Sequence, residues 1–193
     1  SIPPSPMIGC VGKLSHASRA VTPGFKRFKS AVLHVGEWQE FLGGSVYHDV
    51  AGCDGGRVPR VSFTDFARRV EVMSDLVDQG LVLACKPVGP GGLAATLLLM
   101  AFQGDYGCSA WVHSGLRKDA LLFSEQTGFV IEVDRARLAD VESALRKGRV
   151  AHTRIGETVE KADCEIQGIK LPGIMEWERR WHEDLERHTN KGS

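Results

Sequence analysis

Two loops that contain paired glycines are the segments of this sequence best suited to binding chemistry. The first is Leu42-Gly43-Gly44-Ser45. Glycine lets the backbone come close to a ligand and adopt left-handed conformations, and the hydroxyl of Ser45 could bind a phosphate oxygen. A tight turn is the alternative interpretation. The local sequence favours the turn, because glycine is also common in ordinary turns.

The second loop lies between a predicted strand and a predicted apolar helix, and it contains Gly89, Gly91 and Gly92. A helix that begins directly after a strand presents free N–H groups and the positive end of its dipole, which suit an anion. Lys86 could add a contact to a phosphate or could extend into solvent. The spacing matches neither a P-loop nor a dinucleotide-binding fingerprint. Close packing of strand and helix therefore explains these glycines at least as well.

A third polar segment, Ser124-Glu125-Gln126-Thr127, separates two apolar stretches. Glu125 could bind Mg²⁺, because the preferred ligands of this ion are oxygens. A solvated loop carboxylate is the commoner outcome. The dispersed histidines add no candidate metal pair, since His182 and His188 are six residues apart and a helical pair needs a spacing of four.

Several strands in a row, interspersed with helices, must position these loops. The expected strands are 7–12, 31–36, 81–85, near 108–112, near 128–133, near 152–158 and near 163–169. The expected helices are 64–79, 93–102, one that starts after the N-cap Asp134, and 174–188. This order indicates an α+β fold in which a mixed β-sheet is layered with helices, rather than a doubly wound sheet.

The same patterns predict which faces are buried. The segment 81–85 is continuously apolar, which is typical of a strand buried on both faces, and the helix at 93–102 is apolar nearly all round, so it should be central. The expected inner face of the helix at 64–79 consists of Phe66, Val70, Met73 and Val77. The expected inner stripe of the last helix consists of Ile174, Trp177, Trp181 and Leu185.

The composition argues against several classes of protein. The chain has 24 basic and 24 acidic side chains and a net charge of zero, so we expect neither a nucleic-acid partner nor a membrane surface. No apolar run approaches the roughly 20 residues that a membrane span needs. Five single cysteines without a Cys-x-x-Cys pair indicate neither a disulfide framework nor a zinc site and suit a reducing cytoplasm. Each is interpreted as a small buried hydrophobic residue.

Five segments in the right order together resemble one family, although each alone is a weak signal. They are residues 2–12, 20–26, 42–47, 91–94 with 100–102, and 122–125. Over about residues 2–160 the chain is similar to the second half of formylglycinamide ribonucleotide amidotransferase, also called phosphoribosylformylglycinamidine synthase.

The resemblance implies a domain organisation and a reaction. Residues 1–28 would be the tail of a preceding N-terminal-type subdomain, 29–170 a C-terminal subdomain of the aminoimidazole-ribonucleotide-synthetase type, and 171–193 a C-terminal amphipathic helix. The family converts formylglycinamide ribonucleotide to the formylglycinamidine, with ATP, Mg²⁺ and ammonia from glutamine. The isolated chain would then be an inactive fragment of a ligase. Its partners would be the remaining domains of the same polypeptide, a glutaminase domain or subunit, and the small-molecule substrate.

By the same resemblance, the loops would face the substrate or the nucleotide. The residues that this implies are Gly43, Gly44, Ser45, Lys86, Gly89, Gly91, Gly92, Ser124 and Glu125. The sequence departs from the family where His-Asp-x-Ser-Asp-Gly-Gly-Leu is replaced by Lys86-Pro87-Val88-Gly89-Pro90-Gly91-Gly92-Leu93. Proline has neither charge nor an N–H donor. We therefore expect this loop to be a structural copy that holds no metal and provides no acid or base.

Other interpretations remain open at this point. The chain could be a non-catalytic structural or nucleotide-holding half, or part of another ATP-dependent synthetase of the same superfamily. The two tryptophans of the helix at 174–188 could lie in the core or face a partner. A homodimer is possible, because a strand at 7–12 would leave an edge free to pair.

Overall fold

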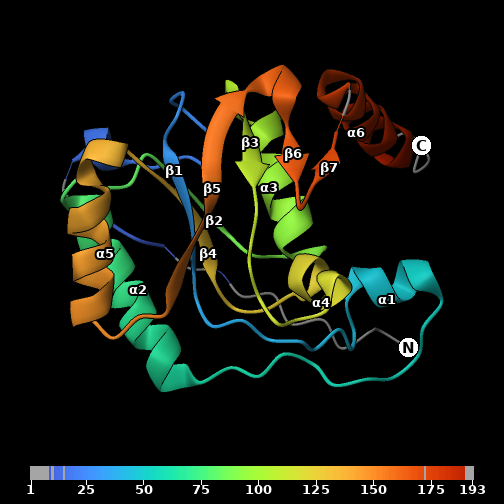
Figure 1. Ribbon diagram of the computed structural model, residues 1–193, viewed down its shortest axis with the longest axis horizontal. Coiled ribbons are helices and arrows are strands. Elements are labelled where there is room, and N and C mark those ends of the chain that lie inside the picture. The colour runs from blue at the N-terminus through green and yellow to red at the C-terminus, as the bar shows by residue number, and fades with distance from the viewer. Residues whose placement is uncertain (1–8, 10, 15, 172, 190–193) are drawn as a thin grey trace.

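A mixed sheet forms the centre of the fold in the computed structural model, which describes residues 9, 11–14, 16–171 and 173–189 (Figure 1). The strands in this part of the chain are β1 (Ala31–Val35), β2 (Ala84–Pro87), β3 (Tyr106–Ala110), β4 (Phe129–Val133), β5 (His152–Glu160), β6 (Glu165–Ile166) and β7 (Ile169–Lys170). Their order is β2-β4-β1-β5-β3-β6-β7. Only β3 and β6 pair in parallel, and the other neighbours are antiparallel. The predicted α+β fold with a mixed sheet is thus confirmed.

Helices lie on both faces of this sheet. They are α1 (Val46–Ala51), α2 (Phe63–Asp78), α3 (Gly92–Phe102), α4 (Lys118–Phe123), α5 (Leu138–Lys147) and α6 (Ile174–Thr189). Short 3-10 turns lie at Ala17–Arg19, Arg135–Arg137 and Lys161–Asp163. Figure 1 shows α2 and α5 together on one side of the sheet, with α3, α4 and α6 on the other. No helix in the described part of the chain is long and apolar enough to cross a membrane.

Two hydrophobic cores lie on opposite faces of the sheet, because successive side chains of a strand point to opposite faces. On β1, Leu33 belongs to the core beneath α2 and α5, together with Leu76 and Leu145. Its neighbour Val32 belongs to the core that α3 covers, which includes Leu97. Asp134 accepts a hydrogen bond from the backbone N–H of Ala136, as expected of a cap, but it caps the 3-10 turn that precedes α5.

The buried face of α2 differs from the predicted one. The fully buried residues of this helix are Arg69, Met73 and Leu76, whereas Phe66 and Val70 are 38% and 42% exposed. The offset arises because the Arg69 guanidinium reaches inward and donates to the carbonyl of Thr127 at 2.6 Å. An arginine is counted as polar in a hydropathy pattern, so the pattern selects a face rotated toward solvent. The end of the helix is as predicted, with Gly80 in the left-handed region after Asp78.

The strand predicted at 81–85 is shifted and is not central. Leu81 and Val82 are buried, but the strand itself runs from Ala84 to Pro87. It lies at the edge of the sheet and pairs along its length with β4 alone. An edge position tolerates Pro87, which has no N–H to donate. The next helix, α3, was expected to be central, but it is buried on one side only, since Leu98, Leu99 and Phe102 remain partly exposed.

Three further expectations concern the ends of the chain. Half of the strand predicted at 7–12 lies outside the described residues, and Gly9, Val11 and Gly12 are in no strand. The region 163–169 forms a hairpin of the two short strands β6 and β7. In α6, Ile174 is buried as predicted, but Trp177 and Trp181 are 49% and 48% exposed, so they are not core residues. The side chain of Leu185 lies outside those that the structure describes.

Candidate functional site

The three loops singled out in the sequence meet at the side chain of Glu125. Its Oε1 atom accepts a hydrogen bond from the backbone nitrogen of Gly91 at 2.9 Å and from that of Val46 at 2.8 Å. Gly91 is the N-cap of α3, and Val46 is the first residue of α1. The carboxylate therefore lies at the N-terminal ends of two helices, where a negative charge is favoured. Residues 42–45, 89–92 and 124–125 form one junction, called here the three-loop junction.

The Gly-Gly-Ser loop is shaped by its own contacts. Ser45 is buried; its hydroxyl donates to the carbonyl of Leu42 at 2.6 Å and accepts from the backbone nitrogen of His48 at 3.3 Å. Gly43 donates its N–H to the carbonyl of Arg57 at 2.9 Å, and a Cβ atom there would lie 2.7 Å from that carbonyl. The Ser45 hydroxyl is thus used as a helix cap. The glycine allows the loop at 52–62 to pass directly beside it.

The glycines at the start of α3 are required by backbone conformation and packing. Gly91 and Gly92 have φ values of +80° and +67°. A Cβ atom on Gly92 would lie 2.7 Å from the carbonyl oxygen of Leu122 in α4. By contrast, a Cβ atom on Gly89 would meet nothing within 4 Å. Lys86 is set apart from this turn, in β2 opposite Val130, where it is half-buried.

Ser124 and Gln126 hold the chain segment that leads into the Gly-Gly-Ser loop. The Ser124 hydroxyl donates to the carbonyl of Phe41 at 2.9 Å. The Gln126 side-chain oxygen accepts from the backbone nitrogen of Gln39 at 2.6 Å. Both side chains are buried. Gln126 was not selected as a site residue from the sequence, because its partner is 87 residues away and no local pattern connects the two.

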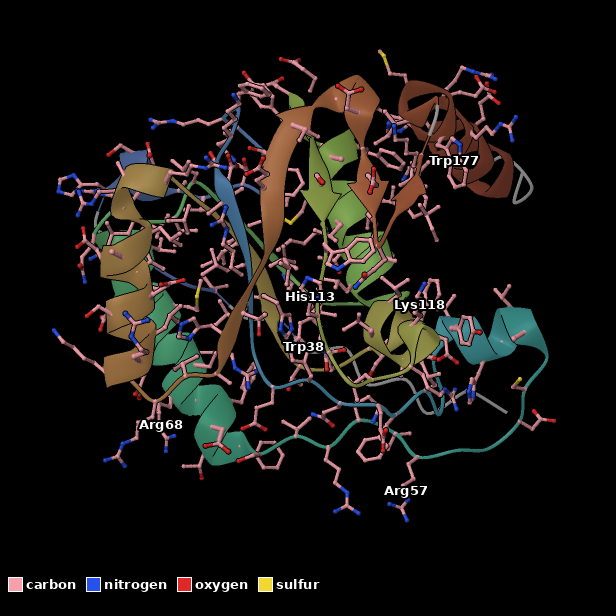
Figure 2. All side chains as sticks on the ribbon, viewed as in Figure 1. Trp38, Arg57, Arg68, His113, Lys118 and Trp177 are labelled. Carbon is pink, nitrogen blue, oxygen red and sulfur yellow. The ribbon has the colours of Figure 1, made fainter. Side chains whose placement is uncertain are left out.

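A polar cleft of about 430 Å³ lies on one side of the three-loop junction. It is lined by Glu40, Phe41, Leu42, Gly43, His48, Gly56, Arg57, Arg117 and Ala120. Arg117 forms an ion pair with Asp119 at 2.6 Å, and this contact raises the pKa of Arg117 and lowers that of Asp119. Figure 2 shows Arg57 on the loop below α1 and α4, with its side chain reaching away from the ribbon. Two residues with cationic side chains, Arg57 and Arg117, therefore belong to the lining of this cleft.

Neither arginine stands out in the sequence. They are 60 positions apart and lie in no recognisable motif. The fold brings them together because Arg57 follows α1 and Arg117 immediately precedes α4. The sequence contains one indirect signal for Arg57, which is that it directly follows the Gly55-Gly56 pair. Paired glycines allow a backbone to turn beside another loop.

An apolar cleft of about 460 Å³ lies on the other side of the junction, between α3 and α6. It is lined by Val46, Pro90, Gly91, Ala95, Leu98, Leu99, Phe102, Trp177 and Trp181. Figure 2 shows Trp177 on α6. This cleft explains why α3 is apolar nearly all round, since one face of the helix contacts the sheet and another lines the cleft. Gly91 belongs both to the cleft and to the junction, and Val46, which also lines the cleft, directly follows the junction residue Ser45.

The described residues do not fit a bound Mg²⁺ ion at the predicted loop. Among them, no three His, Cys, Asp or Glu side chains gather closely enough to hold a metal ion. The Oε1 atom of Glu125 already accepts two backbone N–H groups. Pro87 and Pro90 offer no side-chain oxygen, which Mg²⁺ requires.

Comparison with known proteins connects this geometry to one family. Residues 30–169 match the model described as AIR synthase related protein, C-terminal domain. The chain is 32% identical over 169 residues to a phosphoribosylformylglycinamidine synthase subunit PurL of Methanothrix thermoacetophila, and 33% identical over 170 residues to that of Wolinella succinogenes. These alignments cover 86% and 88% of this chain but 22% and 23% of the relatives. The chain thus spans under a quarter of the length of these two relatives.

Solved structures show the same fold. Thermotoga maritima PurL complexed with FGAR gives a TM-score of 0.64 at 14% identity, over 81% of this chain and 29% of that one. The same protein complexed with ATP gives 0.62 at 14% identity, over 80% and 26%. At such identities the likeness concerns the fold alone. Because the family model covers well over half of the sequence, the chain belongs to the AIR synthase related family and carries its C-terminal domain.

Proposed function

We propose that this chain is one subdomain of an ATP-dependent phosphoribosylformylglycinamidine synthase and that it forms part of a wall of the substrate or nucleotide pocket. Two independent lines support this proposal. Its curated relatives carry the name of that enzyme's subunit. The family to which the chain belongs is related to another enzyme of purine synthesis, the AIR synthase. A cytoplasmic location and a glutaminase domain or subunit as partner belong to the same proposal.

The observation that carries the proposal is the three-loop junction beside the polar cleft. Glu125 fixes the loops through Gly91 and Val46, so the lining of the cleft is held in place without a ligand. Arg57 and Arg117 contribute two cationic side chains to that lining, which also contains Glu40, and Arg117 is paired with Asp119. Guanidinium groups suit phosphate because their donors match its oxygens. We therefore assign the polar cleft to an anionic group of the substrate or the nucleotide.

In the proposed role, the residues of this chain bind and orient but do not transfer protons. In the overall reaction, ATP phosphorylates the amide oxygen of formylglycinamide ribonucleotide, and ammonia then displaces phosphate from the imidate carbon. That chemistry needs positive or N–H-rich loops around the phosphoryl group. The isolated chain offers such loops on one side only. Catalysis would then depend on residues from the rest of the polypeptide.

A second function is a purely structural half, and one observation favours it. The N–H groups of Gly91 and Val46, which would otherwise be available to an anion at the helix ends, already bind Glu125. The Glu125 carboxylate thus occupies the position at these helix ends where the phosphate group of a ligand would otherwise bind. Under this alternative, the junction stabilises the fold and the polar cleft is a surface feature without a ligand.

Titration calorimetry of this chain with formylglycinamide ribonucleotide and with ADP distinguishes the two functions. We expect binding in the millimolar range, about −4 kcal/mol, because only one wall is present. The double variant Arg57→Ala/Arg117→Ala should weaken it at least about tenfold, a loss of about 1.4 kcal/mol. Arg68→Ala is the matched control, since Arg68 lies on α2, away from the cleft (Figure 2). Equal binding by all three proteins, or no binding by any of them, would favour the structural half.

A further inference from the structure

Two cysteines far apart in the sequence lie side by side in the fold. β3 and β6 are parallel neighbours, with Ser109 opposite Glu165. Cys108 and Cys164 immediately precede these two residues, so they occupy adjacent positions on neighbouring chain segments, which are about 4.8 Å apart in a sheet. Their Sγ atoms are 3.9 Å apart, and both side chains are almost completely buried.

The two thiols are not equivalent. The two sulfurs share a hydrogen bond in which either can be the donor. This contact lowers the pKa of Cys164 to about 7 and, together with burial, raises the pKa of Cys108. Cys164 also lines a cleft of about 340 Å³, with Ser109, Asp163 and Lys170 among the other lining residues. Cys164 is therefore the sulfur placed to react first, because thiolates rather than thiols are nucleophiles. Cys108 is placed to react second.

We infer that Cys108 and Cys164 form an oxidisable dithiol, which a peroxide converts to an intramolecular disulfide. In the first step, the Cys164 thiolate attacks one oxygen of hydrogen peroxide, the O–O bond breaks, and a sulfenic acid and hydroxide form. In the second step, the sulfur of Cys108 attacks Cys164, the S–O bond breaks, and the thiol proton leaves with the oxygen as water. Two thiols are oxidised and one peroxide is reduced to two waters.

The geometry suits this bond. A disulfide needs an S–S distance of about 2.05 Å and Cα atoms roughly 4.4–6.8 Å apart, and the strand spacing falls in that range. Rotation of the two side chains is then sufficient to close the 3.9 Å gap. No other pair of cysteine sulfurs within the described residues makes such a contact. Cys53 is exposed at the end of α1, and Cys85 is half-buried in β2.

The disulfide would act on the least supported edge of the sheet. β6 pairs with β3 through two residue pairs only, and β7 pairs with β6 alone. The segment also anchors α6, because Lys161 forms an ion pair with Glu178 at 2.9 Å. A covalent bond from Cys164 to the longer strand β3 would hold this edge and the start of α6 in place. We expect the melting temperature of the oxidised chain to rise by about 5 °C or more.

The test uses the folded chain with Cys53 replaced by serine, which removes the thiol that is exposed among the described cysteines. This variant is treated with hydrogen peroxide, denatured, alkylated with N-ethylmaleimide and digested for mass spectrometry. The expected result is one major linked peptide that contains Cys108 and Cys164, lost on treatment with dithiothreitol. The inference is overturned if the linked peptide stays below about a tenth of the molecules while free thiols are consumed, or if both residues remain alkylated.

Single variants test the order of the two steps. In Cys108→Ala, we expect dimedone to trap a sulfenic acid on Cys164, whereas in Cys164→Ala the thiol at Cys108 should stay reduced. Cys85→Ser is the matched control and should form the linked peptide at the wild-type rate. If Cys108→Ala does not fold, the peptide map of the Cys53→Ser chain still shows whether the disulfide between Cys108 and Cys164 forms. Dimedone labelling of Cys108 in preference to Cys164 would contradict the assigned order.

Discussion

The carboxylate of Glu125 lies 2.9 Å from the backbone nitrogen of Gly91 and binds it as an internal anion at the start of α3. The same oxygen binds the first residue of α1. Val46 and Gly91, which are 45 positions apart in the sequence, are therefore held by one side chain. This arrangement gives the turn at 89–92 a carboxylate partner, although the segment 86–92 has no acidic residue of its own. The negative charge at the helix end comes from a different part of the chain.

Replacement of Glu125 tests whether this contact holds the junction. Glu125→Ala removes the acceptor of two backbone N–H groups, and we expect the free energy of unfolding to fall by about 1–2 kcal/mol. Glu125→Gln keeps an oxygen acceptor but loses the charge, so it should lose about half as much. Urea denaturation measures both variants. Glu71→Ala, on the exposed side of α2, is the control and should change the free energy by less than about 0.5 kcal/mol.

Two glycines of the same loop should respond very differently to alanine. At Gly92, a Cβ atom would meet backbone atoms at 2.7 Å and the φ of +67° is unfavourable for alanine, so we expect Gly92→Ala to destabilise the fold by more than about 2 kcal/mol. At Gly89, nothing lies within 4 Å, and Gly89→Ala should be nearly neutral. Guanidinium unfolding curves compare the two. Equal losses would show that the strain assigned to Gly92 is absent.

His34 should make stability depend on pH. This residue is fully buried, stacks on Trp38 at 4.1 Å between ring centroids, and has no hydrogen-bond partner on either ring nitrogen. Burial, together with the nearby Arg69 charge, lowers its pKa from 6.5 to about 3. In the unfolded chain the ring binds a proton below about pH 6.5. The unfolded state then binds more protons than the folded state, so stability falls as the pH decreases from 6.5 toward 3.

The expected size of this effect is up to about 1.4 kcal/mol for each pH unit below 6.5. Urea denaturation at pH 5 and pH 7 measures it. His34→Gln removes the titrating group, so the difference between the two pH values should shrink relative to the wild type. His182→Gln, at an exposed position of α6, should leave the difference unchanged. If the free energy of unfolding of His34→Gln falls between pH 7 and pH 5 as much as that of the wild type, groups other than His34 cause the acid sensitivity.

The attachment of α6 should depend on Ile174 more than on its tryptophans. Ile174 is 1% exposed and belongs to the core under α3, whereas Trp177 is half-exposed. We expect Ile174→Ala to lower the free energy of unfolding by about 2–4 kcal/mol or to release α6 locally. Amide hydrogen exchange of residues 174–183 separates these two results. In Trp177→Ala, these amides should be protected from exchange almost as well as in the wild type.

The fold class and most elements follow from the sequence because they depend on local periodicity. Residues 31–36, 93–102 and 128–133 carry long apolar runs, and their boundaries in the structure lie within about two residues of the prediction. The face of α2 could not be predicted in the same way. Arg69 is buried through a contact with Thr127, 58 residues away, and a hydropathy pattern contains no information about such a partner.

The site was predictable in part. Glycine and serine loops stand out in the sequence, so Gly43, Gly92 and Glu125 could be selected as candidates. The contacts that these residues make could not be predicted, because the partners of Glu125 are 34 and 79 residues away in the sequence. Arg57 and Arg117 were missed for the same reason. Trp177 and Trp181 have the spacing of a core stripe, but the helix lies far enough from α3 to leave a cleft of about 460 Å³ between them.

A turnover assay shows whether this chain needs the rest of a synthase for catalysis. The purified chain is incubated with formylglycinamide ribonucleotide, Mg-ATP and ammonia, and ADP formation is measured with and without the remaining part of a phosphoribosylformylglycinamidine synthase supplied in excess. We predict no ADP above background from the chain alone, and ADP formation that rises when the two parts are combined and falls at least about tenfold with Arg57→Ala/Arg117→Ala. Substrate-dependent ADP formation by the chain alone would contradict the account.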